Sequence, residues 1–288
     1  MNHNHVRTGV YLPPFGPFGD PAVLVDLAIR AEKAGWDGVF LWDHVVRETL
    51  PIADPWTTFG AIAHTTDRIL FGTTVTPLAR RRPWIVARHA ATLSELSKGR
   101  FVLGTGLGSD ESGDFSRFGE CDDLRARAAR YDEGLEIVRA VWSGRAYRQA
   151  GPHYTVDLPE TVPHSYRIPI WVGCSTSSPK IMRRAAGCDG IFPLIEGRTL
   201  TPKDLSTVVT AVASTGRNAD RPFDFVVAGN ASPAWHEPIS VDLDGLADAG
   251  MTWWLESLMH FDPLELSLEI VDAGPPSTAL GQAGRTTE

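Results

Sequence analysis

One pattern repeats along most of this chain: a short apolar segment, a helix-capping residue, an amphipathic helix and often a glycine. The apolar segments are short and continuous, which is typical of strands buried on both faces of a parallel sheet. We expect strands at residues 7–12, 38–42, 69–75, 101–105, 170–173, 190–192, 223–228 and 251–255. Caps followed by proline predict helix starts at Asp20, Asp54, Ser178, Thr201 and Asp262.

Eight strands that mostly alternate with helices predict an α/β protein, a single (β/α)8 TIM barrel with short insertions in its βα loops. The length of 288 residues fits one barrel of about 250 residues. An open, doubly wound sheet is the alternative. We expect one domain over residues 1–275 and a flexible C-terminal tail over residues 276–288, which is rich in small and polar residues.

Three longer segments interrupt the repeat. Residues 106–123 are rich in glycine and aspartate, residues 143–167 resemble a short strand pair before the fifth strand, and residues 229–238 are irregular. Loops of this length inside a barrel are usually functional lids or disordered excursions.

The composition of the chain indicates which kinds of partner it can bind and in which cellular compartment we expect it. The net charge is −8 and no basic stripe is present, so we expect no nucleic-acid partner. No apolar run approaches the roughly 20 residues of a membrane span, and the N-terminus lacks the apolar segment of a signal peptide. Cys121, Cys174 and Cys188 are odd in number and lack zinc-site spacing, which favours a cytoplasmic protein.

Asp43 and His44 follow directly after the second expected strand. In parallel α/β folds, ligands bind at the carboxyl ends of the strands. A histidine at that position could move a proton or position a substrate. The alternative interpretation is a histidine bonded to a backbone carbonyl. We therefore predict catalytic roles for His44 and Asp43.

A metal-dependent barrel hydrolase is a competing interpretation for a histidine and an aspartate at strand ends. Such hydrolases place a His-x-His pair at the end of the first strand. Here that strand ends in Tyr11-Leu12-Pro13-Pro14, and the pair His3 and His5 precedes the strand. We therefore expect no metal site.

Two further segments, after the third and fourth strands, suit ligand binding. Thr73, Thr74 and Val75 end the third strand, where small residues let a flat ligand approach the backbone, although they also suit an ordinary strand. Gly106 lies in a glycine-rich turn after the fourth strand, which alone is weak evidence for a nucleotide site.

The segment between the fifth strand and its helix predicts an anion site. Its residues are Gly173, Cys174, Ser175, Thr176 and Ser177, followed by Ser178 and Pro179. Hydroxyl groups and free N–H groups at the positive end of a helix suit a phosphate. A cluster of capping residues is the alternative interpretation.

Two other features concern charge. Glu256 ends the last expected strand and is a candidate buried carboxylate with a catalytic role. The three arginines at 80–82 form the one compact basic run, which we interpret as a solvated helix entrance or as an anion contact.

Together these segments resemble the luciferase-like monooxygenase superfamily, the flavin- and deazaflavin-dependent barrel oxidoreductases. The resemblance covers nearly the whole chain. It is carried by AEKAGWDGVFLWDH at 31–44, DPWT at 54–57, FGTTVTPL at 71–78, RRP at 81–83, LSELSKGRFVLGTGLG at 93–108, YDEGL at 131–135 and IPIWVG at 168–173.

The resemblance implies an oxidoreductase that binds F420 or FMN in the barrel mouth and transfers a hydride to or from a small organic substrate, or oxygenates it. His44 matches the active-site histidine of the deazaflavin enzymes, and Thr74–Val75 matches a bulge, often with a non-prolyl cis peptide bond, beneath the ring. Ser175, Thr176 and Ser177 match the phosphate loop. A separate flavin reductase is implied if FMN is used, and a homodimer is possible.

One departure concerns the second proton donor. Some deazaflavin enzymes carry a glutamate directly after the glycines of the fourth strand, whereas here Leu107, Gly108 and Ser109 precede Asp110 and Glu111. A non-catalytic flavin-binding barrel is the alternative from another functional class, and a metal-dependent hydrolase is the less favoured one.

Overall fold

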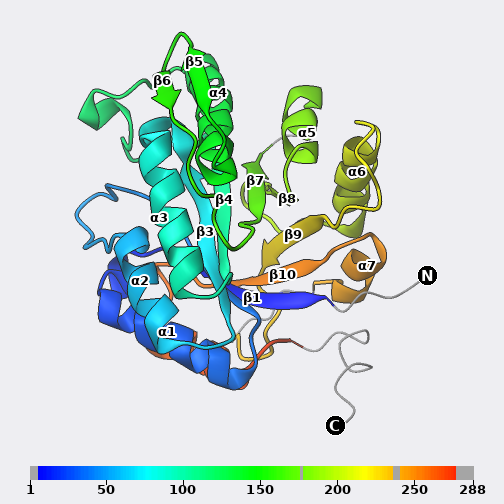
Figure 1. Cartoon of the computed structure of the whole chain (residues 1–288). Helices are drawn as coiled ribbons and strands as arrows, with labels where there is room; N and C mark the ends of the chain where they lie inside the picture. The colour runs from blue at the N-terminus through cyan, green and yellow to red at the C-terminus, as the bar shows by residue number, and fades with distance from the viewer. Residues whose placement is uncertain (1–5, 176–177, 236–240, 277–288) are drawn as a thin grey trace.

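The chain forms a closed barrel of eight parallel strands, as predicted, in this computed structural model, which describes residues 6–175, 178–235 and 241–276 (Figure 1). Around the barrel the strands follow the order β1-β10-β9-β8-β7-β4-β3-β2. Their bounds are β1 Arg7–Leu12, β2 Gly38–Leu41, β3 Leu70–Pro77, β4 Phe101–Gly106, β7 Ile170–Cys174, β8 Gly190–Pro193, β9 Asp224–Gly229 and β10 Trp253–Ser257.

Helices follow the barrel strands and form the outer layer. They are α1 Pro21–Ala34, α2 Pro55–Thr65, α3 Pro83–Leu96, α4 Leu124–Ser143, α5 Pro179–Ala186, α6 Pro202–Ala213, α7 Leu243–Asp248 and α8 Leu264–Ala273, with short 3-10 turns at Gly16–Phe18, Leu78–Arg80 and Ser116–Phe118. None of the helices in the described ranges is long and apolar enough to cross a bilayer.

The helix starts follow the predicted capping residues closely. The side chains of Asp20, Asp54 and Thr201 each accept a hydrogen bond from a backbone N–H of the first helical turn. Asp262 differs, because its carboxylate accepts from the N–H of Met259 and α8 begins two residues later. Local capping therefore sets most of the helix boundaries.

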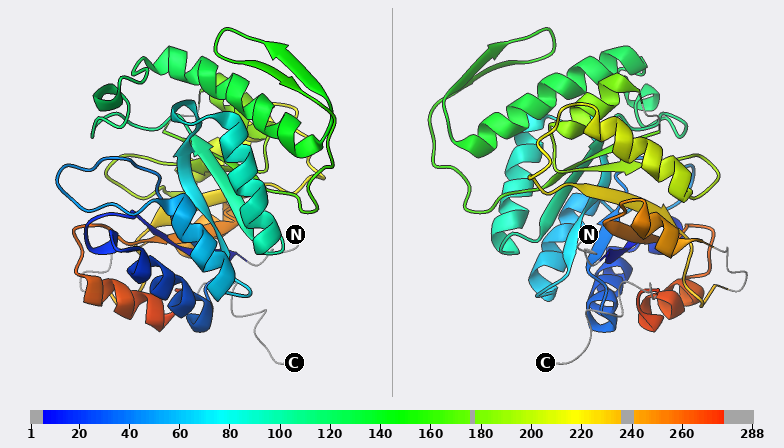
Figure 2. Two further views of the ribbon diagram at one scale, coloured as in Figure 1. Left: turned by 60° about the vertical axis from the view of Figure 1, so that its left-hand side comes forward. Right: turned by 90° about the vertical axis from the view of Figure 1, so that its right-hand side faces the viewer.

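The largest insertion is a hairpin of β5 Tyr147–Ala150 and β6 Thr155–Leu158, so the predicted strand pair is confirmed. It lies between α4 and β7, which makes it an insertion in an αβ connection and not in a βα loop. Figure 2 shows it on the outside of the helix layer. The loop after β4, by contrast, is a βα insertion.

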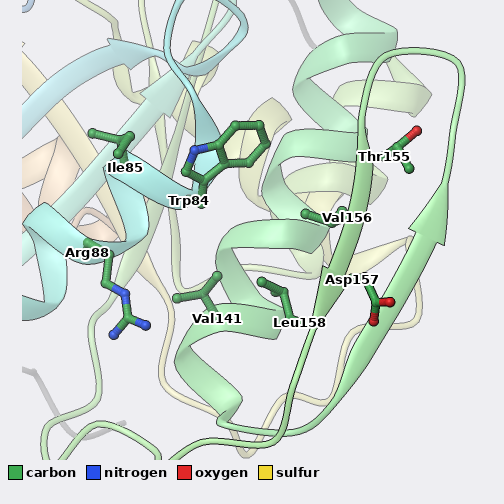
Figure 3. Close-up of a pocket in the computed structure, with 8 residues that line it drawn as sticks. All are labelled: Trp84, Ile85, Arg88, Val141, Thr155, Val156, Asp157 and Leu158. Atoms are coloured by element: carbon green, nitrogen blue, oxygen red, sulfur yellow. The ribbon is translucent and has the colours of Figure 1, made fainter.

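A cavity of about 360 Å³ separates the hairpin from α3 and α4. Val156 and Leu158 point toward the helices, while Thr155 and Asp157 point away, and Trp84 of α3 lines the other side (Figure 3). The cavity is therefore a packing gap outside the barrel and is separate from the barrel mouth.

Aromatic side chains fill the barrel interior near the amino-terminal ends of the strands. The ring centroid of Phe40 lies 4.9 Å from that of Trp171 and 5.5 Å from that of Trp253. Glycines make room for these rings: a methyl group at Gly38 would lie 2.6 Å from Phe40 Cε2, and one at Gly190 would lie 2.5 Å from Trp171 Cδ1. The base of the barrel is thereby closed, which leaves the opposite end for a ligand.

Candidate active site

The mouth of the barrel is formed by loops that follow the strands. The loops after β2 and β4 project from the side of the barrel opposite the start of β1, both in Figure 1 and in the left view of Figure 2. Asp43 and His44 begin the first of these loops, and Asp114 lies in the second. The two loops meet through hydrogen bonds between these residues.

Asp43 lies in the loop just after β2, which ends at Leu41, and is almost completely buried. Arg81 donates two hydrogen bonds to its carboxylate, at 2.8 Å and 2.6 Å, and Arg80 donates one at 3.0 Å. Trp56 Nε1 and Thr76 Oγ1 also donate to Asp43 Oδ2, at 3.0 Å and 2.8 Å. Every oxygen of this carboxylate is therefore occupied by protein donors.

The arginines also determine the charge state of Asp43. Burial by itself raises the pKa of a carboxyl group, but the guanidinium groups of Arg81 and Arg80 outweigh it and hold the pKa of Asp43 below its usual range. Asp43 is thus an ionised anchor for two arginines. These contacts suit a residue that positions the loop, and a direct catalytic role for Asp43 stays a prediction.

His44 is held from one side by the loop after β4. Its Nδ1 lies 2.5 Å from Oδ2 of Asp114. The rings of Phe15 and Trp42 flank the imidazole, each with its centroid 5.8 Å away. Because the His44 side chain keeps 20% of its surface exposed, it can reach a ligand in the mouth.

The peptide bond between Thr74 and Val75 is cis, and the register of β3 shifts between Thr73 and Thr76. The predicted bulge with a non-prolyl cis bond is therefore confirmed. The hydroxyl group of Thr73 donates to the carbonyl of Gly104 at 2.7 Å, so Thr73 ties β3 to β4. The hydroxyl group of Thr74 is buried and has no partner among the described residues.

Val75 brings three of the predicted cofactor residues together. Its side chain is only partly buried and lies between Gly106 of β4 and Gly173 of β7. A methyl group at Gly106 would lie 2.7 Å from Val75 Cγ2, and one at Gly173 would lie 2.6 Å from Val75 Cγ1. The two glycines thus leave space for Val75, whose exposed part faces the interior near the mouth.

The predicted anion segment starts at the carboxyl end of β7. Gly173 and Cys174 are partly buried there, and Ser175 is exposed. Thr176 and Ser177 lie outside the described residues. The next helix, α5, begins at Pro179, and Ser178 at its N-cap makes no side-chain capping bond. The helix start is therefore at the expected end of the barrel.

Glu256 is fully buried, as predicted, but lies within β10 and faces away from the barrel interior. Its neighbours Trp253 and Leu255 belong to the interior cluster, whereas Trp254 packs on the outer side. Its carboxylate accepts from Trp254 Nε1, and also from Trp235 Nε1 and the N–H groups of residues 231 and 232. These contacts suit an anchor for the loop after β9, and a catalytic role stays a prediction.

Sequence reasoning missed Asp114 and Thr76 and did not assign partners to Arg80 and Arg81. The aspartates of the loop after β4 were visible only as composition, and nothing in their spacing singles out Asp114. The run at 80–82 proved to be neither solvated nor an external anion contact at its first two positions, because Arg80 and Arg81 bind Asp43.

Two further observations concern other kinds of site. A groove of about 760 Å³ runs between α1 and α2 on the outside of the barrel and is lined by Val25, Ile29, Thr57 and Ala61 among others. Within the described ranges, no group of three or more histidine, cysteine, aspartate or glutamate side chains is arranged to hold a metal ion.

Residues 2–240 match the family described as luciferase-like monooxygenase. The chain belongs to this family. The match spans the first strand of the barrel, the Asp43–His44 end of β2 and the cis peptide bond of β3. The match therefore includes the residues of the candidate site.

Among curated proteins, the luciferase-like chain is 34% identical over 214 residues to an F420-dependent glucose-6-phosphate dehydrogenase of Beutenbergia cavernae, covering 70% of this chain and 60% of that protein. It is 33% identical over 163 residues to a protein of the same name from Nakamurella multipartita, covering 54% of this chain and 47% of that protein. The chain thus spans only about half to three-fifths of the length of these relatives.

Solved structures share the fold at low sequence identity. An F420-dependent secondary alcohol dehydrogenase, solved with an F420-acetone adduct, matches with a TM-score of 0.74 and 18% identity, covering 93% of this chain and 97% of that one. The long-chain alkane monooxygenase LadA matches with a TM-score of 0.67 and 17% identity, covering 93% of this chain and 90% of that one. Both neighbours support the barrel fold.

Proposed function

We propose that this chain is an oxidoreductase that binds F420 or FMN in the barrel mouth and transfers a hydride between that ring and a small organic substrate. The observation that carries the proposal is the juxtaposition of two loops at one barrel end, with His44 held by Asp114 on one side and Val75 on its cis peptide bond on the other. The curated relatives, which are F420-dependent glucose-6-phosphate dehydrogenases, favour F420.

The residues of the mouth fit a planar ring. Val75 offers a partly exposed apolar surface, and Tyr11 and Trp42 line the interior nearby, with ring centroids 5.5 Å apart. Aromatic and aliphatic side chains of this kind pack well against a flat ring. Trp42 Nε1 and Thr74 Oγ1 are buried without a hydrogen-bond partner among the described residues, and a polar ring edge could supply one.

The segment from Gly173 to the start of α5 would hold the phosphate of the cofactor. Ser175 is exposed at the end of β7, and the first N–H groups of α5 follow it. Free N–H groups and the positive end of a helix bind anions. Cys174, Thr176 and Ser177 belong to this proposed phosphate loop on the basis of the family motif.

When bound, the ring supplies an atom that accepts or donates a hydride. During oxidation of an alcohol, the hydride leaves the carbon with both electrons of its C–H bond, and the hydroxyl group loses a proton as the C=O bond forms. His44 would take that proton and would return it in the reverse direction. Asp43 and Glu256 would act by positioning, through the loops that they hold.

Partners and location extend this proposal. A separate flavin reductase would be needed only if FMN is the cofactor, and a second copy of the chain could complete the substrate pocket. A cytoplasmic location is supported by the cysteine usage and by the redox cofactor. We propose no metal, nucleic-acid or membrane partner.

A titration with F420 and with FMN, followed by turnover of a hydroxylated substrate panel that includes glucose 6-phosphate, tests the proposal. We expect one ring per chain, and we expect His44→Ala to keep ring binding while lowering turnover by about 10²–10⁴-fold. His153→Ala, an exposed histidine of the β5–β6 hairpin, is the matched control and should change neither quantity.

The alternatives predict different outcomes. A non-catalytic flavin-binding barrel would bind the ring, turn nothing over and be indifferent to His44→Ala. A metal-dependent hydrolase would bind zinc stoichiometrically and no ring. Either result would contradict the proposed function.

A further inference from the structure

The two carboxylate oxygens of Asp114 contact different partners. Oδ1 accepts from the backbone N–H groups of Val45 at 2.7 Å and of Val46 at 3.3 Å, and it lies 3.1 Å from Nη1 of Arg80. Oδ2 faces Nδ1 of His44 alone, at 2.5 Å. The Asp114 side chain is only 2% exposed, so this arrangement is fixed by the protein and not by water.

The charge of Asp114 decides which nitrogen of His44 carries hydrogen. Burial by itself raises the pKa of Asp114, but the hydrogen bonds from His44 and from the Val45 N–H, together with the Arg80 charge, hold that pKa below its usual range. An ionised carboxylate only accepts hydrogen bonds. Nδ1 of His44 must therefore be the donor in this contact.

We propose that Asp114 is a positioning residue that fixes the neutral His44 imidazole in the Nδ1–H tautomer and leaves the lone pair of Nε2 available toward the mouth. No described residue forms a hydrogen bond with Nε2, and the His44 ring stays between Phe15 and Trp42. The consequence for turnover rests on the proposed function, whereas the tautomer itself does not.

Replacing Asp114 by asparagine should reverse the tautomer. The two backbone N–H groups and Arg80 all require an oxygen at the Oδ1 position. The amide of Asn therefore turns its NH₂ group toward His44, and Nδ1 becomes an acceptor. The imidazole then carries its hydrogen on Nε2, where it cannot accept a proton from a substrate.

The test is a long-range ¹H–¹⁵N correlation spectrum of protein labelled with ¹⁵N-histidine, recorded without cofactor at about pH 9, where an ordinary histidine is neutral. His44→Gln identifies the His44 signals. We expect the Nδ1–H pattern in the wild type and the Nε2–H pattern in Asp114→Asn. Asp110→Asn is the matched control, because Asp110 lies in the same loop and accepts from residues 115 and 116, not from His44.

An Nε2–H pattern in the wild type, or an Nδ1–H pattern in folded Asp114→Asn, would overturn the proposal. If Asp114→Asn does not fold, the wild-type spectrum alone decides. Turnover of the ring-loaded protein is the second arm. We expect kcat to fall about 10²–10⁴-fold in Asp114→Asn with little change in ring affinity. An unchanged kcat together with the reversed tautomer would count against the proposed role of His44 and not against the tautomer.

Discussion

The two ends of this barrel are stabilised by different kinds of interaction. At the mouth, Asp43 binds Arg80 and Arg81, so buried ion pairs hold the loop after β2 to the segment after β3. At the base, Trp171 and Trp253 pack against each other with ring centroids 5.4 Å apart, and no loop is involved. The base is thus stabilised by aromatic packing between strands. The mouth is stabilised by ion pairs between residues that are distant in the sequence.

The carboxylates at the two ends also differ in their protonation. One of the carboxylates at the base, Asp224, accepts from Trp171 Nε1 and from the hydroxyl group of Thr252. Burial raises the pKa of Asp224, whereas the arginines hold the pKa of Asp43 below its usual range. The pKa values of these two carboxylates are thus shifted in opposite directions, and the ionised one lies at the end that also holds His44.

The largest effect on stability is expected from Trp171→Ala at the base. This change removes a fully buried side chain and should lower the free energy of unfolding by about 3–5 kcal/mol, as measured by urea denaturation. Trp84→Ala is the matched control, because Trp84 lies beside the outer cavity and is only partly buried. An equal loss of unfolding free energy in the two variants would show that the aromatic packing at the base stabilises the protein no more than Trp84 does.

A smaller effect is expected from Asp43→Asn at the mouth. It removes a buried carboxylate shared by Arg80 and Arg81 and leaves Asp114 as the remaining partner of Arg80, whose side chain is 6% exposed; the change should cost about 3 kcal/mol in the same measurement. Asp26→Asn removes one of the two exposed carboxylate partners of Arg30 and should leave stability nearly unchanged. If Asp43→Asn and Asp26→Asn lower the free energy of unfolding equally little, the buried ion pairs of Asp43 do not stabilise the mouth.

The smallest effect is the dependence of stability on pH, and its sign differs between the two ends. The folded-state pKa of Asp43 is lowered, so its contribution is present above about pH 4 and is lost as the pH falls through the folded-state value. The folded-state pKa of Asp224 is raised, so its contribution is present below about pH 4 and is lost as the pH rises through the folded-state value.

Urea denaturation over a series of pH values measures both contributions. We expect Asp43→Asn to reduce the loss of stability on acidification and Asp224→Asn to reduce the loss just above pH 4. Each unit of pKa shift corresponds to about 1.4 kcal/mol. If either substitution changed the pH dependence of the unfolding free energy in the opposite direction, the contrast between Asp43 and Asp224 would be wrong.

The sequence was sufficient for the fold because its signals are local. Caps such as Asp54, stops such as Gly35 and apolar strands each fix their own element. The cis bond before Val75, which the family resemblance implies, is present as well. Asp114 could not be predicted, because it lies 70 residues from His44 in an irregular loop and only the closed barrel brings the two together.

For the carboxylates, the sequence did not reveal which residues each side chain contacts. Asp43 was expected to face a ligand because it ends β2, but Arg80 and Arg81 lie 37 and 38 residues further along the chain and occupy it. Glu256 was expected to be a buried carboxylate with a catalytic role; it is buried, but it alternates with the interior residue Leu255 and faces outward. Position along a strand was readable from sequence, whereas the partners of each carboxylate were not.

A crystal structure of the protein with bound F420 or FMN tests the central claim most directly. The account predicts that the ring lies in the barrel mouth against Val75, with Nε2 of His44 facing its redox-active centre. Density for the ring in the groove between α1 and α2, or in the cavity beneath the hairpin, with the mouth closed over Val75, would contradict it.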